Sequence, residues 1–330
     1  MFLPHSYLSA LLLLILSMLL WGSWANAQKA EHGLPFELFY WDYVWGLLLT
    51  VWLAGITLDN LRPYTSENFF KNLAHANSSH LLEALAGGAV FNLGNVLLVA
   101  AISLAGMAVA FPVGAGIGLV LGVGLNYAIA PSGNPVLLFG GIVLVLLAIA
   151  LDARAYAGLK HNAGSASRSG VAVSMAAGIA IGLFYPLVAR ALRGPGHLNP
   201  YTVLAIFSAG VLVSSFPLLF WFMRHPLQGP RVGLQDYRKM PLRQHAWGWL
   251  AGALWALGTA ANFAASYLPL IGPATAFALG EGNTMISALW GVLVWKEFRG
   301  ANRRVQILIF FMFVSFAAGL VAIALAPIVH

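Results

Sequence analysis

The stretch Gly88-Ala-Val-Phe-Asn-Leu-Gly-Asn95 decides the fold, because it returns later in the chain as Gly252-Ala-Leu-Trp-Ala-Leu-Gly-Thr259. The same offset of 164 residues, with no gap, pairs Gly116 with Gly280 and Gly118 with Gly282. Apolar composition favours chance matches, but this offset is almost half of the 330 residues. The sequence therefore predicts two related halves, residues 1–165 and 166–330.

The composition of the chain indicates that lipid is its solvent. Hydrophobic residues make up 60% of the sequence and charged residues 8%, whereas a soluble domain is roughly a quarter charged. A membrane-spanning helix needs about 20 mainly apolar residues, and ten stretches qualify. Their approximate bounds are 8–27, 38–58, 81–103, 107–129, 136–152, 170–189, 201–223, 246–268, 271–295 and 305–329. We expect an all-α integral membrane protein with ten transmembrane helices.

The offset of 164 residues corresponds to five of these spans. Because five is odd, the two five-helix repeats would be inverted, as in many secondary transporters that bind substrate near the bilayer midplane. Of the 17 Lys and Arg residues, 13 follow spans 1, 5, 7 and 9, and the other four follow spans 2 and 6. The positive-inside rule then places the first group in the cytoplasm and both termini outside. A segment near 66–77 also suggests a short interfacial helix.

The first span has a second interpretation. Its apolar run ends in Ala25-Asn26-Ala27, which resembles a signal-peptide cleavage site. A signal peptide usually begins with positive charge, however, and residues 1–7 contain no Lys or Arg. We therefore favour a retained span in the cell membrane.

Several functional classes find no support in the sequence. The chain has no cysteine, which excludes disulfides, thiolate metal sites and thiol nucleophiles. Metalloprotease, serine hydrolase and P-loop motifs are absent, and an aspartyl hydrolase using Asp42 and Asp152 is left only as a formal alternative. The net charge of +7 is spread between apolar runs rather than along one stripe, so nucleic acid is not expected as a partner. We expect no enzyme, no cofactor and no metal.

Glu281 is the leading functional candidate. It lies about ten residues into the ninth span, where an ionised side chain costs at least a few kcal/mol. Such a carboxylate would contact the substrate or couple transport to protons, unless neighbouring helices satisfy it as a structural acid. Asp42, within the aromatic run 39–43, is a second proton-coupling candidate, although that run also fits an interfacial belt.

Amides and indoles form a second group of candidates. Amides donate and accept hydrogen bonds without the desolvation cost of a charge, and indole faces stack on flat rings. The alternative role for the amides is helix-to-helix hydrogen bonding, worth about 0.6 kcal/mol each. The candidate substrate-binding residues, with Glu281, are Asn92, Asn95, Asn262, Asn283, Thr284, Trp21, Trp24 and Trp255.

Several strings together resemble the ureide permease family of the drug/metabolite transporter superfamily, with its bacterial relatives near glucose and rhamnose uptake permeases. The strings, in order, are Trp21-Gly22-Ser23-Trp24, Trp41-Asp42-Tyr43, Leu125-Asn126-Tyr127, Trp249-Leu250-Ala251-Gly252, Ser287-Ala288-Leu289-Trp290-Gly291 and Lys296-Glu297-Phe298-Arg299. The resemblance covers most of the chain. It implies the ten-helix drug/metabolite transporter fold and proton-driven import of neutral nitrogen-rich rings such as allantoin, uracil and oxopurines.

Two departures from the family pattern bear on the substrate. Plant members carry a long central loop with a Walker A-like stretch, whereas the segment from Asp152 to Arg168 is short here. The family pattern commonly has Gln where this chain has Glu281. We predict a symporter that works by alternating access around a cavity between spans 1, 3, 4, 8 and 9. A monosaccharide permease, a metabolite exporter and a non-transporting receptor are the alternatives, and the sequence leaves a homodimer open.

Overall fold

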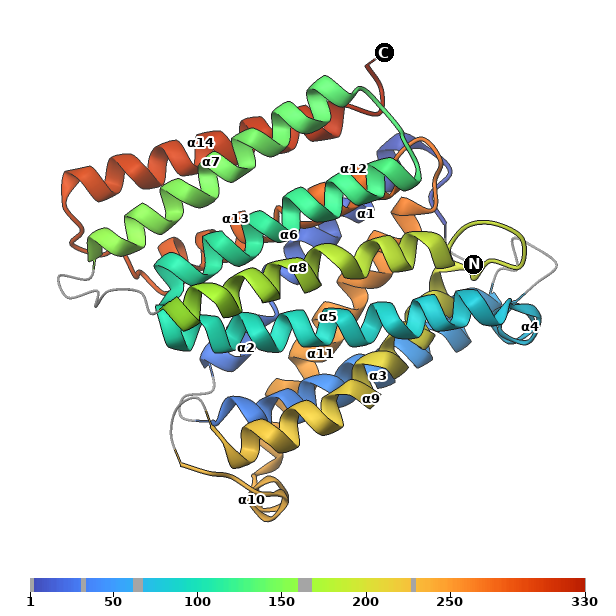
Figure 1. Ribbon diagram of the computed structural model, residues 1–330, viewed down its shortest axis with the longest axis horizontal. Helices are drawn as coiled ribbons and strands as arrows, with labels where there is room; N and C mark the ends of the chain where they lie inside the picture. The colour runs from blue at the N-terminus through green and yellow to red at the C-terminus, as the bar shows by residue number, and fades with distance from the viewer. Residues whose placement is uncertain (1–2, 31–33, 62–67, 160–167, 227–229, 330) are drawn as a thin grey trace.

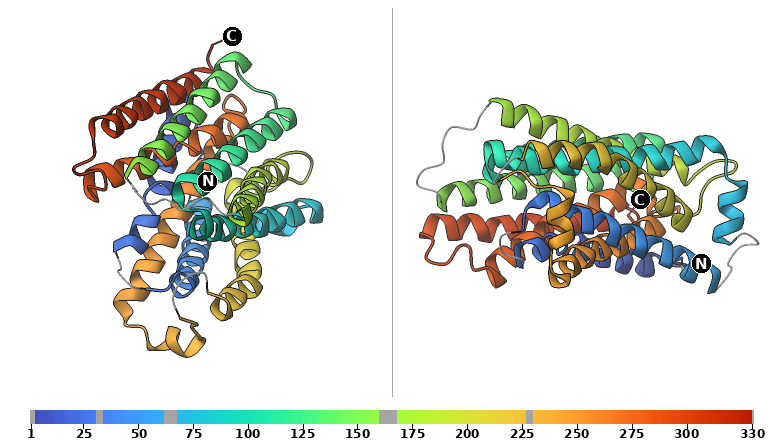
Figure 2. Two further views of the ribbon diagram at one scale, coloured as in Figure 1. Left: turned by 60° about the vertical axis from the view of Figure 1, so that its left-hand side comes forward. Right: turned by 90° about the horizontal axis from the view of Figure 1, so that it is seen from below.

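The computed structural model describes residues 3–30, 34–61, 68–159, 168–226 and 230–329, and over these residues it is helical with no strand (Figure 1). The long helices run side by side as one bundle in all three views (Figures 1 and 2). The helices are α1 Tyr7–Trp21, α2 Ala25–Ala30, α3 Phe36–Leu61, α4 Phe69–His75, α5 Ser78–Ala105, α6 Met107–Ile129, α7 Pro135–Leu159, α8 Arg168–Ala191, α9 Pro200–Arg224, α10 Leu234–Lys239, α11 Leu242–Ser266, α12 Gly272–Gly280, α13 Asn283–Leu289, the π-helix η1 Trp290–Val294 and α14 Arg303–Leu325.

Nine segments of the described chain are long and apolar enough to cross a membrane. They coincide with nine of the ten expected spans, which confirms a helical membrane protein with many spans. The remaining expected span, the eighth at 246–268, corresponds to the 25-residue helix α11. This helix is not among the nine because polar side chains such as Thr259, Asn262 and Ser266 lower its mean hydropathy. All three of these side chains are buried. The short helix expected near 66–77 is α4, with residues 66–67 outside the described part.

Two expected spans are interrupted rather than continuous. The first ends as α1 at Trp21 and resumes as α2 at Ala25. The ninth breaks at Glu281 and Gly282, between α12 and α13, where the Gly282 N–H donates to Leu279 O at 3.0 Å instead of to the carbonyl one residue further back. Breaks of this kind expose backbone polar groups at membrane depth and are tolerated where protein or a cavity surrounds them.

Glycines let the central helices approach backbone to backbone. Helix α5 packs against α8 and α9, α11 packs against α1 and α3, and α7 packs against α14. A Cβ added to Gly88 would lie only 1.9 Å from Phe207 O in α9, and one added to Gly252 would lie 2.1 Å from Tyr43 O in α3. Small residues at such crossings allow the close packing that holds membrane helices together.

Both ends of the chain lie at the same end of the bundle (Figure 1). The Tyr7 hydroxyl donates a hydrogen bond to the Ala324 carbonyl, which ties the start of α1 to the end of α14. The short helices α2 and α10 lie toward the opposite end (Figure 1).

Candidate functional site

The two interrupted spans meet at a cavity of about 570 Å³ inside the bundle. Ligand pockets in proteins typically measure about 300–1,000 Å³, so the space suits one small molecule. Its walls come from α1–α2, α5–α6 and α13, with contributions from α7, α8 and α11. Seven of the residues expected in the binding site line this cavity: Trp21, Trp24, Trp255, Asn95, Glu281, Asn283 and Thr284.

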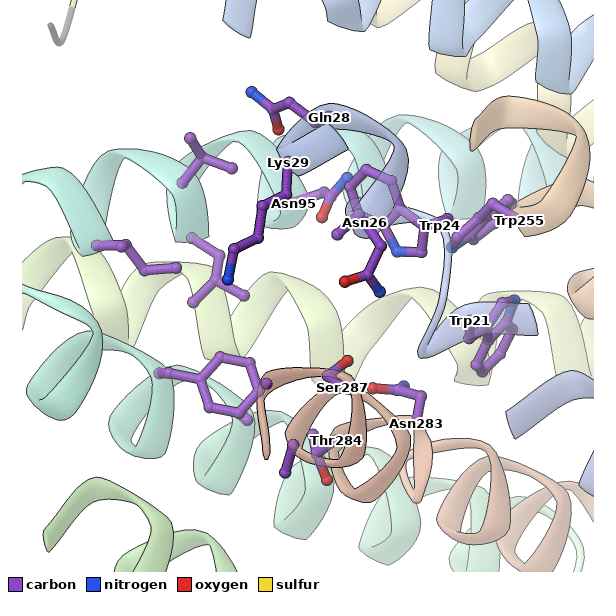
Figure 3. Close-up of a pocket in the computed structure, with 18 of the residues that line it drawn as sticks. Trp21, Trp24, Asn26, Gln28, Lys29, Asn95, Trp255, Asn283, Thr284 and Ser287 are labelled. Carbon is purple, nitrogen blue, oxygen red and sulfur yellow. The ribbon is translucent and has the colours of Figure 1, made fainter. Parts of the chain in front are cut away.

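Indole rings form one wall of the cavity. Trp21 and Trp255 lie nearly parallel, with ring centroids 6.0 Å apart and an interplanar angle of 15°. The Trp21 indole N–H donates to Thr259 Oγ1 at 3.0 Å, which fixes the ring. Trp24 lies near Trp255 in the close-up and packs against Tyr43 at 4.9 Å between centroids (Figure 3). These rigid apolar faces suit a flat ligand ring.

Polar groups occupy the facing wall. Asn283, Thr284 and Ser287 lie together on α13, across from Asn26 and Lys29 of α2 (Figure 3). Helix α13 is bound to the turn after α1, because Ser287 Oγ donates to the Gly22 carbonyl at 3.1 Å.

Glu281 lies at the break between α12 and α13 and contributes to the lining of the cavity. No hydrogen bond or ion pair joins its carboxylate to another residue of the described chain. Its backbone is held, since Glu281 N–H donates to Phe277 O at 3.0 Å and Glu281 O accepts from Thr284 Oγ1 at 3.0 Å. A fixed backbone with a carboxylate that has no protein partner leaves that group available to a proton or a ligand N–H.

Asn92 and Asn262 lie behind the cavity wall rather than on it. Asn92 accepts from the Tyr40 hydroxyl at 2.8 Å and donates to Ser214 Oγ at 2.9 Å. Asn262 accepts from the Tyr185 hydroxyl at 2.5 Å and donates to the Ala276 carbonyl at 3.1 Å. Both amides therefore join helices to one another. Asn95, one turn after Asn92, also donates to the Tyr40 hydroxyl at 3.0 Å, but it contributes to the lining of the cavity.

Asp42 lies apart from the cavity, in a cluster with α10 and the start of α11. Its carboxylate is fully buried, accepts from the Tyr237 hydroxyl at 2.6 Å and pairs with His245 Nδ1 at 2.9 Å. Burial, together with the hydrogen bond to Asp42, raises the pKa of Tyr237, so that this hydroxyl remains a donor at physiological pH. The cluster ties the segment between α9 and α11 to α3.

We predict that Asp42→Asn lowers the stability of the protein by about 1–3 kcal/mol, because a buried donor loses its charged acceptor. The amide retains the shape of the carboxylate, and the cavity lies elsewhere. Thermal unfolding in detergent should therefore show a lower Tm with unchanged ligand affinity. Tyr237→Phe, which removes one of the two partners, should show a smaller fall. Loss of the pH dependence of uptake in well-folded Asp42→Asn would contradict this structural role.

An ionic group at one end of the cavity was not predicted from the sequence. Lys29 pairs with Glu297, and its ammonium also lies 4.9 Å from the Trp295 ring centroid. The Tyr156 hydroxyl donates to Glu297 at 2.5 Å, and Trp295 Nε1 donates to Asn26 Oδ1 at 2.6 Å. These residues come from α2, from α7 and from the turn after η1, which are far apart in the sequence, so no local motif could have indicated their meeting.

A helical bundle with many membrane spans and an internal, partly polar cavity is the architecture expected of a membrane permease. Residues 39–166 and 159–327 match the family model for ureide permeases, and the chain belongs to this family. It is accordingly a transport protein and not an enzyme.

Individual relatives match between 73% and 100% of the chain. Ureide permease 1 of Arabidopsis thaliana is 25% identical over 401 residues, covering 100% of both chains, and ureide permease 2 of the same plant is 24% identical, covering 96% of each. Probable ureide permease A3 of Vigna unguiculata is 24% identical over 73% of this chain and 81% of its own. A protein of known crystal structure, 16% identical, superposes with a TM-score of 0.61 over 96% of this chain and 98% of its own, which indicates a shared fold.

Proposed function

We propose that this protein is a secondary active transporter of the cell membrane that imports a small neutral polar solute by alternating access. The solute that fits best is a ureide, a nucleobase or a related nitrogen heterocycle. The observation that carries the proposal is the cavity itself, in which indole faces lie opposite amides, hydroxyls and two carboxylates, Glu281 and Asp152, that make no hydrogen bond within the described part of the chain. The relatives named as ureide permeases support the same class of substrate.

The cavity suits the chemistry of a cyclic urea or imide. Such a ring is flat and presents alternating N–H and C=O groups around its edge. The Trp24 and Trp255 rings would cover its face, the amides of Asn95 and Asn283 would donate to its carbonyls, and Glu281 would accept from a ring N–H. A pyranose could also bind the amides through its hydroxyls. Its ring is puckered, however, so it would stack less closely on the indole faces than a flat ring does.

The packing of the two halves supports inverted repeats of five helices each. Gly88 packs against Phe207, and Gly252 packs against Tyr43. At the offset of 164 residues, Gly252 is the counterpart of Gly88 and Phe207 is the counterpart of Tyr43, so the second contact repeats the first with the halves exchanged. Two further glycine contacts show the same exchange: Gly46 with Trp249, and Gly210 with Leu85. A pseudo-twofold axis that swaps the halves would give this pattern. With α11 counted as the eighth span, the chain would have the ten spans of a drug/metabolite transporter.

The cavity reaches the end of the bundle that carries most of the basic residues. Lys29, Tyr156 and Glu297 line it, and Arg154, Lys296 and Arg299 lie within two residues of the last two. By the positive-inside rule this end faces the cytoplasm. The structure then corresponds to an inward-facing state, with both termini outside.

Proton coupling through Glu281 completes the proposal. A carboxylate at this depth is costly when it is ionised and unpaired, so closure of the cavity would favour its protonated form. A proton taken up on one side and released on the other would drive import.

A ligand screen tests the proposed substrate class. Ligands that bind only the folded state raise the melting temperature by mass action, and a concentration of 100 Kd adds about 2.7 kcal/mol. We expect allantoin, uracil or a purine to raise the Tm of the detergent-purified protein and to accumulate in proteoliposomes, with common monosaccharides as the matched negative set. Stabilisation and uptake of a sugar alone would favour a monosaccharide permease, and no uptake of any solute would contradict a transporter.

A further inference from the structure

We propose that the seam between α8 and the α11–α12 pair is a latent second cavity, which opens to the opposite side of the membrane when the present cavity closes. This inference rests on the proposed function, because it applies the relation between the two halves to the pathway of the solute. It assigns the outward pathway to residues that do not line the present cavity.

The first evidence is the chemistry of the symmetry-related positions. In the present cavity, the wall made by α5 and α6 includes Asn95, Leu98, Ile102, Ser103 and Phe111. Their counterparts 164 residues later are Thr259, Asn262, Ser266, Tyr267 and Thr275. These five counterparts each carry a polar group, and three of them stand where the first wall has the apolar Leu98, Ile102 and Phe111. The other lining residues of α5 and α6, Phe91, Val99 and Ala115, have the counterparts Trp255, Phe263 and Leu279, so the polar positions form one part of the wall. Polar groups on this wall are expected if water and solute reach it during part of the cycle.

The second evidence is the burial of these polar groups in the present state. The four residues Thr259, Asn262, Ser266 and Thr275 have relative exposures of 0–1%. Thr275 Oγ1 has no hydrogen-bond partner in the described part of the chain. A buried hydroxyl without a partner costs free energy that a closed, permanently dry interface would have no reason to retain.

The hydrogen bonds of this wall allow it to separate from α8. Thr259 Oγ1 donates to the Trp255 carbonyl at 2.8 Å, and Ser266 Oγ donates to the Phe263 carbonyl at 3.0 Å, both within α11. Asn262 donates to the Ala276 carbonyl of α12, which belongs to the same wall. None of these bonds would break if α11 and α12 moved together away from α8.

Two hydrogen bonds between side chains close the seam. The Tyr185 hydroxyl of α8 donates to Asn262 Oδ1 at 2.5 Å, and the same hydroxyl also interacts with the Ser266 side chain of α11. Nearer the end of the bundle, His197 Nε2 and the Tyr267 hydroxyl lie 3.0 Å apart, and the other ring nitrogen of His197 lies 2.9 Å from Gly194 O, so the Tyr267 hydroxyl is the donor to Nε2. The present cavity would close when α2 moves toward α5 and α6. We expect that movement to separate α8 from α11 and so to break these two bonds.

Thiol labelling tests the latent cavity directly, because the natural chain contains no cysteine. Single variants Ser266→Cys and Thr275→Cys would be exposed to a membrane-impermeant sulfonated maleimide, added to either face of membranes that contain the protein. Ser103→Cys, in the present cavity, reports labelling from the other face. Ala264→Cys, buried on α11 but off the wall, is the matched control. We expect Ser266→Cys and Thr275→Cys to react only from the face opposite to that for Ser103→Cys, and Ala264→Cys not to react.

A second substitution makes the test independent of any one cysteine. Tyr267→Phe removes the hydrogen bond to His197, and one such bond shifts an equilibrium by between about twofold and tenfold. The labelling rate at positions 266 and 275 should rise by that factor while the rate at 103 does not rise. Absence of labelling at both positions in protein that takes up solute would overturn the latent cavity and leave the transporter intact. Protein that takes up no solute would instead overturn the proposed function, whatever its labelling pattern.

Discussion

Glu281→Gln should reduce proton-driven uptake in proteoliposomes by roughly ten- to a hundredfold, the range expected when a hydrogen bond to a charged group is lost. The amide has nearly the same shape as the carboxylate, and no neighbouring residue of the described chain depends on the carboxylate. The variant should therefore insert, fold and melt like the natural protein. What it loses is the group that gains and releases a proton, so the remaining uptake should no longer respond to an imposed pH gradient.

A parallel measurement separates coupling from binding. Exchange of labelled for unlabelled solute across the membrane needs no net proton movement, so Glu281→Gln should retain more exchange than net uptake. Glu83→Gln is the control, because Glu83 lies outside the cavity and pairs with Arg190 at 2.9 Å and with His80 at 3.0 Å. It changes the same functional group and should leave the pH dependence unchanged. Full, normally pH-dependent uptake by Glu281→Gln would exclude this carboxylate as the coupling site.

The helical membrane architecture was predictable because hydropathy is a property of whole segments. A window of about 20 residues averages over single positions, so the expected bounds agree with the helices to within a few residues, except that the fifth span continues to Leu159 instead of ending at 152. The same averaging conceals the breaks at residues 22–24 and 281–282, where three and two residues leave the regular helix without changing the mean hydropathy. The glycines Gly22 and Gly282 were visible, but glycine is also frequent in continuous membrane helices, so they could not be assigned to breaks from the sequence alone.

The site was harder to predict because helical periodicity does not say which face meets a cavity. Asn92 and Asn95 are three residues apart on α5 and were equal candidates, yet Asn92 joins α5 to α3 and α9 while Asn95 lines the cavity. The pairing of Lys29 with Glu297 depends on the meeting of two segments 268 residues apart. Glu281 could be identified earlier because an acid at mid-span is costly wherever it points.

Gly88→Ala and Gly252→Ala should each prevent normal folding or greatly lower the yield of folded protein. The added methyl group would lie 1.9 Å from Phe207 O and 2.1 Å from Tyr43 O, respectively, and both neighbours are backbone atoms of packed helices. A backbone carbonyl in α9 or α3 cannot move alone, because the whole helix would have to shift away from its neighbour. Overpacking of this kind costs about 1–3 kcal/mol and sometimes more, and here it acts on the helix contacts that replace a hydrophobic core in a membrane.

The controls are Gly124→Ala and Gly140→Ala, since a Cβ at either position meets no atom within 4 Å. Alanine is a better helix former than glycine by up to about 1 kcal/mol, so these two variants should fold at least as well as the natural protein. Size-exclusion profiles and thermal unfolding of all four variants in one detergent would measure the difference. Because Gly88 and Gly252 are counterparts in the two halves, their substitutions should have similar effects. Normal folding of Gly252→Ala beside failure of Gly88→Ala would contradict the symmetry from which both the inverted repeat and the second cavity were inferred.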